Sequence, residues 1–175
     1  MIHLYTGDGK GKTTAAVGLC MRAAGWDRQV CFAQFMKGND SGELHILEKL
    51  ENITVLRSER NYGFYHSMSE SDKKAVLAVH NRILEGILEV LENESCHIVI
   101  LDEVTYPVKW NLLDREKLER ILGFGRPGAG QEIEIVLTGR NAEDFLIDAS
   151  DYVTEMKCVR HPYEQGIGAR EGIEF

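Results

Sequence analysis

The stretch Thr6–Gly18, TGDGKGKTTAAVG, constrains the fold of this chain more than any other segment. Gly11-Lys12-Thr13 resembles the end of a phosphate-binding loop, in which Gly-Lys-Ser/Thr follows a first Gly after four residues. Here Thr6 stands in the first position, and counting from Gly7 leaves the loop one residue short. The sequence therefore raises the question of whether this is a phosphate loop and what its unusual spacing does.

The surroundings of the loop favour a phosphate site. The apolar segment Ile2–Thr6 is typical of a strand, and the residues from Lys12 to about Ala24 are compatible with a helix that Gly25 ends. Strand, loop and helix in this order are the setting that a phosphate loop requires. Loop glycines and a helix N-terminus direct backbone N–H groups at an anion. We therefore expect amides of Gly7, Gly9 and Gly11, ammonium groups of Lys10 and Lys12, and a Mg²⁺-binding hydroxyl from Thr13.

A second motif supports this interpretation. The apolar segment His97–Val104, HIVILDEV, delivers Asp102 and Glu103 at its end. Phosphate-loop proteins hold Mg²⁺ with an acid at the end of such a strand. Mg²⁺ prefers oxygen ligands and keeps several waters, so either acid could bind it directly or through water. The predicted metal residues are Thr13, Asp102 and Glu103; the alternative is a strand that ends in solvated acids.

Strands and helices alternate along the rest of the chain. This alternation predicts an α/β fold of three layers, with a mostly parallel sheet between helices. No linker divides the sequence, so we expect one nucleotide-binding domain over residues 1–175. The further strands are predicted at Gln29–Phe35, Ile53–Arg57, Glu132–Arg140 and Tyr152–Cys158. Helices are predicted at Leu44–Leu50, at Ser69–Leu91 after a capping box, around Leu118–Leu122, and in a short segment opened by Asn141, with a surface loop at Gly123–Glu132.

Composition excludes several classes of function. The net charge of −8 argues against broad binding of nucleic acid, which needs a basic face. No apolar run reaches the roughly 20 residues of a membrane helix, and no secretory start is present. Cys20, Cys31 and Cys96 lie among apolar residues, and no C-x-x-C pair occurs. These features favour a cytoplasmic protein with reduced thiols and without membrane or nucleic-acid partners.

Five motifs in a fixed order resemble the ATP:corrinoid adenosyltransferases, the cob(I)alamin and cob(I)yrinic acid a,c-diamide adenosyltransferase family. They are TGDGKGKTTAAVGLCMRAAG, QFMKG followed by GE, VILDEVTY, VLTGR and the closing HPYEQGIGAREGIEF. The resemblance covers nearly the whole chain and implies a phosphate-loop NTPase (RecA-like) fold. It implies that a cobalt(I) corrinoid attacks C5′ of ATP, forms a Co–C bond and releases triphosphate. It also implies that ATP binds in reverse, with the unusual loop around the triphosphate.

The resemblance assigns residues as well as a reaction. It implies catalytic roles for Lys12, Phe64 and Glu103, and it places Gln34, Lys37 and Glu43 at the site. Arg22 could equally be a solvated helix residue, and Lys37 a loop charge. The implied ATP-binding residues are Gly7, Asp8, Gly9, Lys10, Gly11, Lys12, Thr13, Thr14, Arg22 and Arg140.

The aromatic loop Ser58–Met68 is implied to be the corrinoid side, with Tyr62, Phe64 and His66 nearest the substrate. In the family, aromatic residues here displace the lower axial ligand of cobalt(II), which eases its reduction. Phe64 matches the family's Phe, but His66 stands where some members have Trp. Because imidazole can ligate cobalt or form hydrogen bonds, its role is open. The structural alternative is a loop in which Tyr62, Phe64 and Tyr65 pack beneath the sheet.

The resemblance also predicts partners. A homodimer and an electron-donating flavoprotein are expected, with ATP and a corrinoid as substrates and Mg²⁺ as cofactor. Several relatives have an additional N-terminal helix that covers the site; here the C-terminal GIGAREGIEF could supply part of the cover. Two other functions fit the motifs: an ordinary phosphate-loop kinase or ATPase that transfers a phosphoryl group, and a nucleotide-gated binding module that consumes no ATP.

Overall fold

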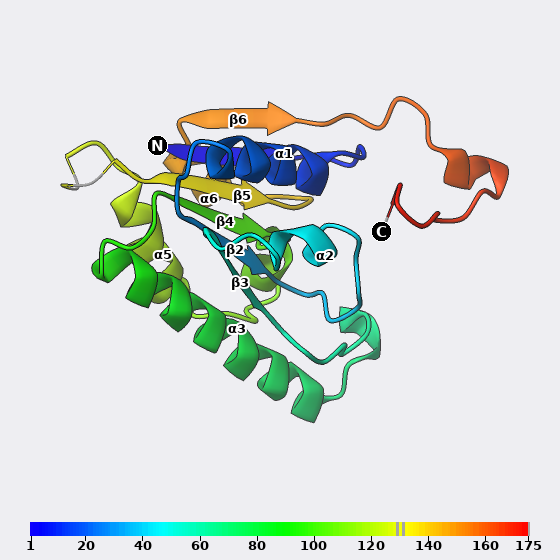
Figure 1. Cartoon of the computed structure of the whole chain (residues 1–175). Coiled ribbons are helices and arrows are strands. Elements are labelled where there is room, and N and C mark those ends of the chain that lie inside the picture. The colour runs from blue at the N-terminus through cyan, green and yellow to red at the C-terminus, as the bar shows by residue number, and fades with distance from the viewer. Residues whose placement is uncertain (129, 131, 175) are drawn as a thin grey trace.

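A single sheet of six parallel strands forms the centre of the computed structural model, which describes residues 1–128, 130 and 132–174. The strand order is β3-β2-β4-β5-β1-β6 (Figure 1), so β5 lies between β1, which leads into the phosphate loop, and β4, which delivers the acids. The strands are β1 (Ile2–Thr6), β2 (Val30–Gln34), β3 (Ile53–Arg57), β4 (Ile98–Asp102), β5 (Glu134–Thr138) and β6 (Tyr152–Glu155).

Helices cover both faces of the sheet, which makes three layers and confirms the predicted α/β fold. One face carries α1 (Lys12–Ala24) and α2 (Leu44–Leu47). The short helix α4 (Thr105–Lys109) follows shortly after β4. The opposite face carries α3 (Glu70–Glu92), α5 (Arg115–Phe124) and α6 (Asp144–Ala149). Two 3₁₀ turns, Tyr65–Ser67 and Pro162–Gln165, lie in the connections.

The strand sequences explain the layers. In β4, Ile98 and Ile100 pack with α1, whereas Val99 and Leu101 pack with α3 and α5. Side chains of a strand alternate between faces, so a strand covered on both sides is apolar throughout. Every residue of β2 and β4 is buried. These two central strands therefore fix the position of the loops that follow them.

The predicted capping box at the start of α3 is confirmed. The hydroxyl of Ser69 accepts a hydrogen bond from the backbone N–H of Asp72, and the Asp72 carboxylate accepts one from the N–H of Ser69. The helix runs from Glu70 to Glu92, within one residue of the predicted end. Local capping and apolar spacing thus suffice to define this element.

Several predicted boundaries are wrong where the backbone turns sharply. The strand predicted to reach Phe35 ends at Gln34, two residues before Met36, whose φ is 56°. The strand predicted to reach Val104 ends at Asp102, just before Glu103, whose φ is 59°. Left-handed residues cannot continue a strand. The strands predicted over Glu132–Arg140 and Tyr152–Cys158 are likewise shorter, and the helix predicted over Leu44–Leu50 ends at Leu47.

Helix α6 begins later than predicted. Asn141 does not open it, because its φ is 51°, and Glu143 occupies the N-cap position before Asp144. Helix α4 was not predicted. Helix α5 extends through Gly123 and Phe124, which the sequence placed in a loop; Ala129 and Gln131 of that loop lie outside the described residues.

All four cysteines are free thiols. Cys20, Cys31 and Cys96 are buried, as predicted, and burial raises their pKa values. Cys158 is exposed. In the part of the chain that the structure describes, no helix combines the length and the apolar character needed to cross a bilayer.

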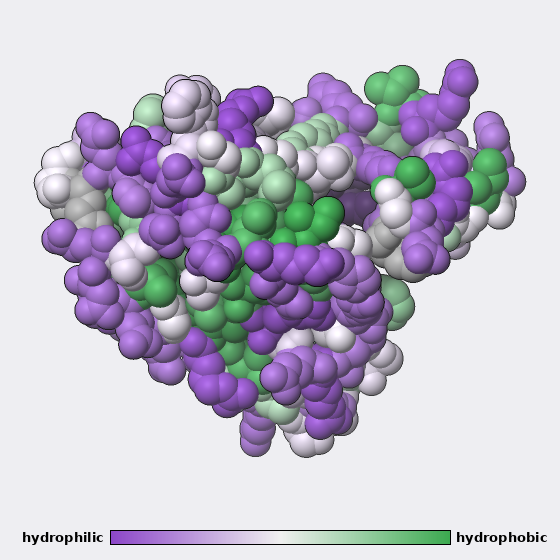
Figure 2. All heavy atoms as spheres, in the orientation of Figure 1, coloured by the Kyte–Doolittle hydropathy of each residue, from purple (hydrophilic) through white to green (hydrophobic). Residues whose placement is uncertain are grey.

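The segment after β6 projects from the body of the molecule and then turns back towards it (Figure 1). Nearly all of residues 157–174 are exposed. Figure 2 shows this segment as a separate lobe with apolar side chains on it and a hollow between it and the body. The exposed apolar residues are Val159, Tyr163, Ile167 and Ile173. Phe175, the aromatic end of the last motif, lies outside the described residues.

Candidate functional site

Most of the predicted site residues gather at the carboxyl edge of the sheet, where ligands of open parallel sheets bind. The segments that follow β1, β2, β4 and β5 all emerge at this edge. An open cleft of about 1050 Å³ lies there. It is lined from one side by Thr13 and Thr14 of the phosphate loop and from the other by Phe64 and His66 of the aromatic loop. The two halves of the predicted site therefore share one cleft.

Lys12 lies across the phosphate loop. Its ammonium donates to the carbonyl oxygens of Gly7 and Gly9, each at 2.7 Å. Burial lowers the pKa of Lys12, and the nearby Arg140 lowers it further, while Glu103 and Asp8 oppose this shift. The ammonium is thus enclosed by the carbonyl groups of the loop.

The unusual loop is packed against the segment after β6. The N–H of Gly9 donates to the carbonyl of Met156 at 2.7 Å. A Cβ on Gly7 would lie 2.5 Å from that oxygen, and one on Gly9 would lie 2.7 Å from it. Both distances are closer than a real Cβ can approach another atom. These two glycines are therefore required by packing against Met156, and the Gly9 N–H, which was expected to face an anion, is bonded to the Met156 carbonyl instead.

Asp102 is the hub of the polar site. Its side chain has 0% of its surface exposed. Oδ1 accepts from the Thr13 hydroxyl at 2.8 Å and from the Thr138 hydroxyl at 2.7 Å, and Oδ2 accepts from Lys37 Nζ at 2.8 Å. Sequence reasoning missed Thr138, although it is the Thr of the VLTGR motif and the last residue of β5. The hub joins the loops of three strands.

Glu103 has a carboxylate oxygen with no partner. Oε2 is buried and unbonded, and the backbone has φ 59° and donates its N–H to Thr138 at 3.0 Å. Burial raises the pKa of Glu103, as does Asp102, while Lys37 and Lys12 oppose the shift. An unbonded buried carboxylate oxygen in the cleft that Thr13 also lines fits a hard cation.

The donor set suits Mg²⁺ better than a metal held by protein groups alone. Among residues 1–128, 130 and 132–174, no three His, Cys, Asp or Glu side chains are grouped to hold a metal. Two acids and a hydroxyl leave positions for water and phosphate oxygens, as Mg²⁺ requires. Gln34 Oε1, also buried and unbonded, is a further oxygen at this place.

Gln34, Lys37 and Glu43 join the same cluster. The amide of Gln34 lies 3.5 Å from Glu43 Oε1 and 3.5 Å from Asp102 Oδ2. Burial alone would lower the pKa of Lys37, but the carboxylates of Asp102, Glu103 and Glu43 outweigh burial and raise it. Lys37 is therefore a charged member of the cluster and not a solvated loop residue.

Three aromatic rings form a stack in the wall of the cleft. Trp110 lies 4.4 Å from Tyr65 and 4.8 Å from Tyr106, centroid to centroid, at angles of 9° and 15°. Phe64, 85% exposed, stands beside them. Tyr106 and Trp110 were not predicted as site residues. They follow the acidic motif and stand four residues apart, and this helical spacing was the available signal. Tyr62 does not line this cleft and instead packs beneath Arg60, whose guanidinium is 4.8 Å from the ring centroid.

Not every implied residue lies at the cleft. Arg22 is in the last turn of α1 and lines a separate hollow with Trp26 and His97. At ten residues from Lys12, it lies about 15 Å along the helix. Its contact with ATP stays a prediction. Arg140 and Asp8 are exposed, and both act electrostatically on Lys12.

The returning C-terminal segment reaches the cleft. Gly172, Ile173 and Glu174 line it, and Glu174 Oε1 lies 3.2 Å from Lys10 Nζ. Arg170 also pairs with Glu174 at 3.0 Å, and hydrogen bonds from Arg170 lower the pKa of Glu174 to about 2. The segment after β6 therefore contacts the phosphate loop twice, near its start through Met156 and near its end through Glu174.

The parallel sheet, the glycine-rich loop before α1 and the buried acid at the end of β4 define a phosphate-loop nucleotide-binding protein. A solved structure titled EssC (ATPases 2 and 3) from Geobacillus thermodenitrificans has the same fold, with a TM-score of 0.53 and 14% identity over 98% of this chain and 34% of that one.

Residues 1–175 match the family described as ATP:corrinoid adenosyltransferase BtuR/CobO/CobP, and the chain belongs to this family of transferases. It is 32% identical to a corrinoid adenosyltransferase of Sinorhizobium sp., over 100% of this chain and 80% of that protein. It is also 32% identical to the corrinoid adenosyltransferase CobA of Salmonella typhimurium and 31% identical to that of Escherichia coli, over 85% of each. Nothing in these comparisons favours an ordinary kinase or ATPase.

Proposed function

We propose that this chain transfers the 5′-deoxyadenosyl group of ATP to the cobalt of a corrinoid and releases triphosphate in one piece. The substrate cobalt(I) supplies the electron pair of the new Co–C bond. The C5′–O bond breaks, and its electron pair leaves with the triphosphate. The observation that carries this proposal is the shared cleft, which has Thr13 and Glu103 in one wall and exposed aromatic rings in another.

The nucleophile is the substrate's own metal, so the protein need not activate a hydroxyl or a water. The demand on the protein is the negative charge that develops on the departing triphosphate. Fixed N–H groups and cations aimed at developing charge are the most effective form of stabilisation. Lys12 is enclosed by the loop and Lys10 is exposed beside it. We assign both ammonium groups, with Arg140, to the triphosphate.

We assign Mg²⁺ to the Thr13 hydroxyl and the carboxylates of Asp102 and Glu103. The support is chemical: a buried carboxylate oxygen on Glu103 has no partner, and Asp102 already accepts from Thr13. The ion would neutralise charge on the triphosphate. Lys37 contacts the Asp102 carboxylate and offsets its negative charge at this end of the cleft.

The aromatic wall is assigned to the corrinoid. Phe64 is exposed into the cleft and free to contact a flat substrate, whereas Tyr65 is held in the stack with Trp110. We propose that Phe64 displaces the lower axial ligand of cobalt(II). Reduction of cobalt(II) to cobalt(I) needs one electron from outside the chain, and a reduced flavoprotein is the proposed donor.

We further propose that residues 1–175 act as one domain in a cytoplasmic homodimer. The projecting segment 157–174 presents Val159, 94% exposed, and Ile173, which would be covered by a second copy. The free thiols support a reducing compartment. Light scattering of the purified chain tests the dimer: a monomer mass at micromolar concentration overturns it.

Product analysis tests the reaction. The chain is incubated without oxygen with Mg²⁺, ATP and chemically reduced cob(I)alamin. We expect a light-sensitive Co–C product and one triphosphate per product. ADP and phosphate in equal amounts would overturn the proposal in favour of phosphoryl transfer, and a bound corrinoid spectrum without a Co–C bond would favour a binding module.

A further inference from the structure

His80 is a buried histidine that no step of the proposed reaction uses. It lies on α3 with 2% of its surface exposed. Nδ1 is 2.8 Å from the carbonyl oxygen of Leu112, and Nε2 is 3.3 Å from the backbone N of Met36. A carbonyl only accepts and an N–H only donates, so Nδ1 carries the proton and Nε2 accepts. One neutral ring thus joins two loops to α3.

The bond from the Met36 N–H to His80 Nε2 fixes the residue before Lys37. Met36 has φ 56°, a left-handed conformation that is unfavourable for a residue with a Cβ. The preceding Phe35 still donates its N–H to Asp102 O at 2.9 Å, as an extension of the β2–β4 pairing. The chain therefore reverses at Met36, and His80 accepts the N–H that the reversal exposes.

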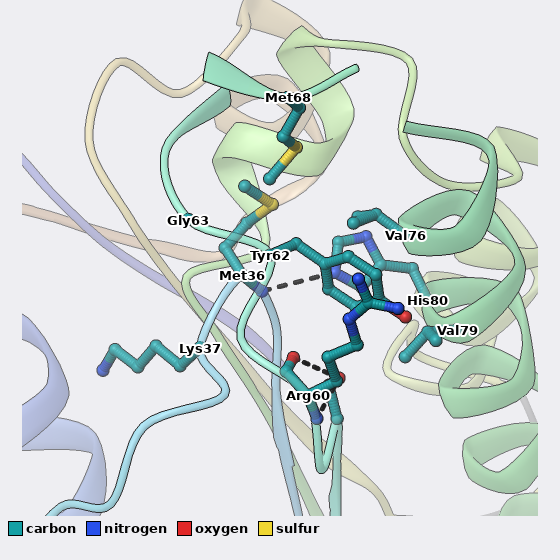
Figure 3. A pocket seen from close by; sticks show the side chains of 10 residues that line it. Met36, Lys37, Arg60, Tyr62, Gly63, Met68, Val76, Val79 and His80 are labelled. Carbon is teal, nitrogen blue, oxygen red and sulfur yellow. Dashed lines mark hydrogen bonds between the residues drawn. The ribbon is translucent and has the colours of Figure 1, made fainter. Parts of the chain in front are cut away.

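The reversal directs Lys37 into the polar site. Figure 3 shows the Met36 N–H bonded to the His80 ring while the Lys37 side chain points away from this pocket. Lys37 Nζ reaches Asp102 Oδ2 at 2.8 Å and lies 3.5 Å from the Thr13 hydroxyl. His80 thus does not line the cleft but holds the backbone that aims an ammonium at its polar end.

The bond from His80 Nδ1 to the Leu112 carbonyl holds the aromatic end. Leu112 follows Trp110, whose ring stacks on Tyr65, and Leu112 packs in one cluster with Met68 and Val76. The ring of Phe35 packs edge-on against His80 at 5.2 Å and prevents the imidazole from turning. A single buried side chain therefore ties together the loops that line opposite ends of the cleft.

We propose that His80 is a positioning residue of the transferase, which acts through Met36 to place Lys37 and through Leu112 to place the Trp110 stack. The assignment rests on the proposed function for its meaning in turnover, but the placement of Lys37 at the nucleotide end can be tested by ATP binding alone. His80→Gln offers an amide oxygen near Nε2 and can accept the Met36 N–H. His80→Asn reaches only the Nδ1 position, and His80→Leu keeps neither bond.

A double-mutant cycle between His80→Leu and Lys37→Ala is the test. The readouts are the dissociation constant of Mg·ATP without corrinoid, and kcat and KM of Co–C bond formation. In the wild-type background we expect His80→Leu to weaken Mg·ATP binding about 10-fold and to lower kcat/KM on the order of 10- to 100-fold, because a small misplacement has effects of this size. In the Lys37→Ala background we expect a change of no more than about twofold in ATP affinity, since coupled residues are not additive.

His80→Gln should recover most of the ATP affinity that His80→Leu loses, while His80→Asn should not. The matched control is His97→Leu, which removes a histidine that accepts from the Gln29 N–H at 3.1 Å at the opposite edge of the sheet. It should leave both readouts unchanged.

Equal losses from His80→Leu in both backgrounds would overturn the proposal. Equal ATP affinities for the Gln and Asn variants would do so even if the Leu variant does not fold. If the wild type forms no Co–C bond, the proposed reaction fails, and the ATP-binding cycle still decides the role of His80.

Discussion

The ammonium of Lys37 lies 2.8 Å from Oδ2 of Asp102, so a cation from the loop after β2 neutralises a fully buried carboxylate at the end of β4. The same carboxylate accepts from Thr13 through its other oxygen. Lys37 Nζ is 3.5 Å from the Thr13 hydroxyl as well. In this structure the ammonium therefore occupies a position between two of the proposed Mg²⁺ ligands.

Replacing Lys37 should make stability depend on Mg²⁺. Lys37→Ala leaves a buried carboxylate without its charged partner, which we expect to cost about 1–3 kcal/mol. A divalent ion can take over this role, so millimolar Mg²⁺ should raise the Tm of the variant more than that of the wild type. Calorimetry with and without Mg²⁺ measures both shifts. Lys49→Ala, an exposed lysine with no ion pair among the described residues, is the control. Equal Mg²⁺ shifts in all three proteins would contradict the assignment.

Lys12→Ala should abolish most of the turnover and leave the fold intact. The side chain donates to two loop carbonyls, but the loop is also held by Met156 and by α1. Loss of one well-placed donor to developing charge lowers kcat on the order of 10²–10³-fold. Steady-state assays of Co–C formation and circular dichroism check the two parts. Near-normal kcat would remove Lys12 from the leaving-group role, and Lys74→Ala, exposed on α3, should behave like the wild type.

Phe64→Ala should separate reduction from transfer. The side chain is 85% exposed, so its loss removes little packing and should not change Tm. If it displaces the axial ligand of cobalt(II), assays that begin from cobalt(II) with a reductant should lose on the order of 10- to 100-fold, since the geometry at cobalt is lost. Assays supplied with cobalt(I) should change much less. Equal losses in both assays would contradict this role. The control is Trp26→Ala: Trp26 is exposed in the separate hollow that Arg22 also lines, and its loss should affect neither assay.

The order of strands and helices and the phosphate loop could be predicted because each rests on local signals. Gly11-Lys12-Thr13 between a strand and a helix, and a Ser69–Asp72 capping box before an apolar repeat, need no tertiary information. The same holds for Asp102 and Glu103, since an apolar run that ends in two acids shows where the strand ends and where the acids are placed. These residues are found together in the structure.

The parts that sequence reasoning missed depend on contacts between distant segments. Trp110 was not assigned because its stack with Tyr65 joins segments about 45 residues apart. Met156 supports the phosphate loop through its backbone carbonyl, and a backbone contact of this kind cannot be predicted from the type of the residue. The ends of β2 and β4 were missed because the left-handed residues that follow them, Met36 and Glu103, are held by tertiary hydrogen bonds.

The neutral state of His80 should make the fold acid-sensitive. Burial lowers the pKa of His80 to about 4, against an ordinary value of 6.5. Between these pH values His80 therefore binds a proton in the unfolded chain but not in the folded one. The contribution of His80 to the free energy of unfolding is complete above pH 6.5 and is lost as the pH falls towards 4. The shift corresponds to about 3 kcal/mol. Urea unfolding of the wild type and His80→Gln at several pH values tests this. The stability difference between the two should shrink as the pH falls, and a constant difference would contradict it.

Gly9→Ala should show that the loop's glycines serve packing as well as phosphate binding. A Cβ on Gly9 would lie 2.7 Å from Met156 O and 2.8 Å from Lys157 O, both backbone atoms that cannot turn aside. We expect a loss of about 1–3 kcal/mol, as for other overpacked sites, and weaker ATP binding because the loop must move. Gly18→Ala in α1 is the matched control: nothing lies within 4 Å of its Cβ position, and alanine in a helix should stabilise the chain by about 0.5–1 kcal/mol. Calorimetry and ATP titration of both variants decide. If Gly9→Ala keeps the wild-type Tm and affinity, then the segment after β6 does not hold the phosphate loop in place.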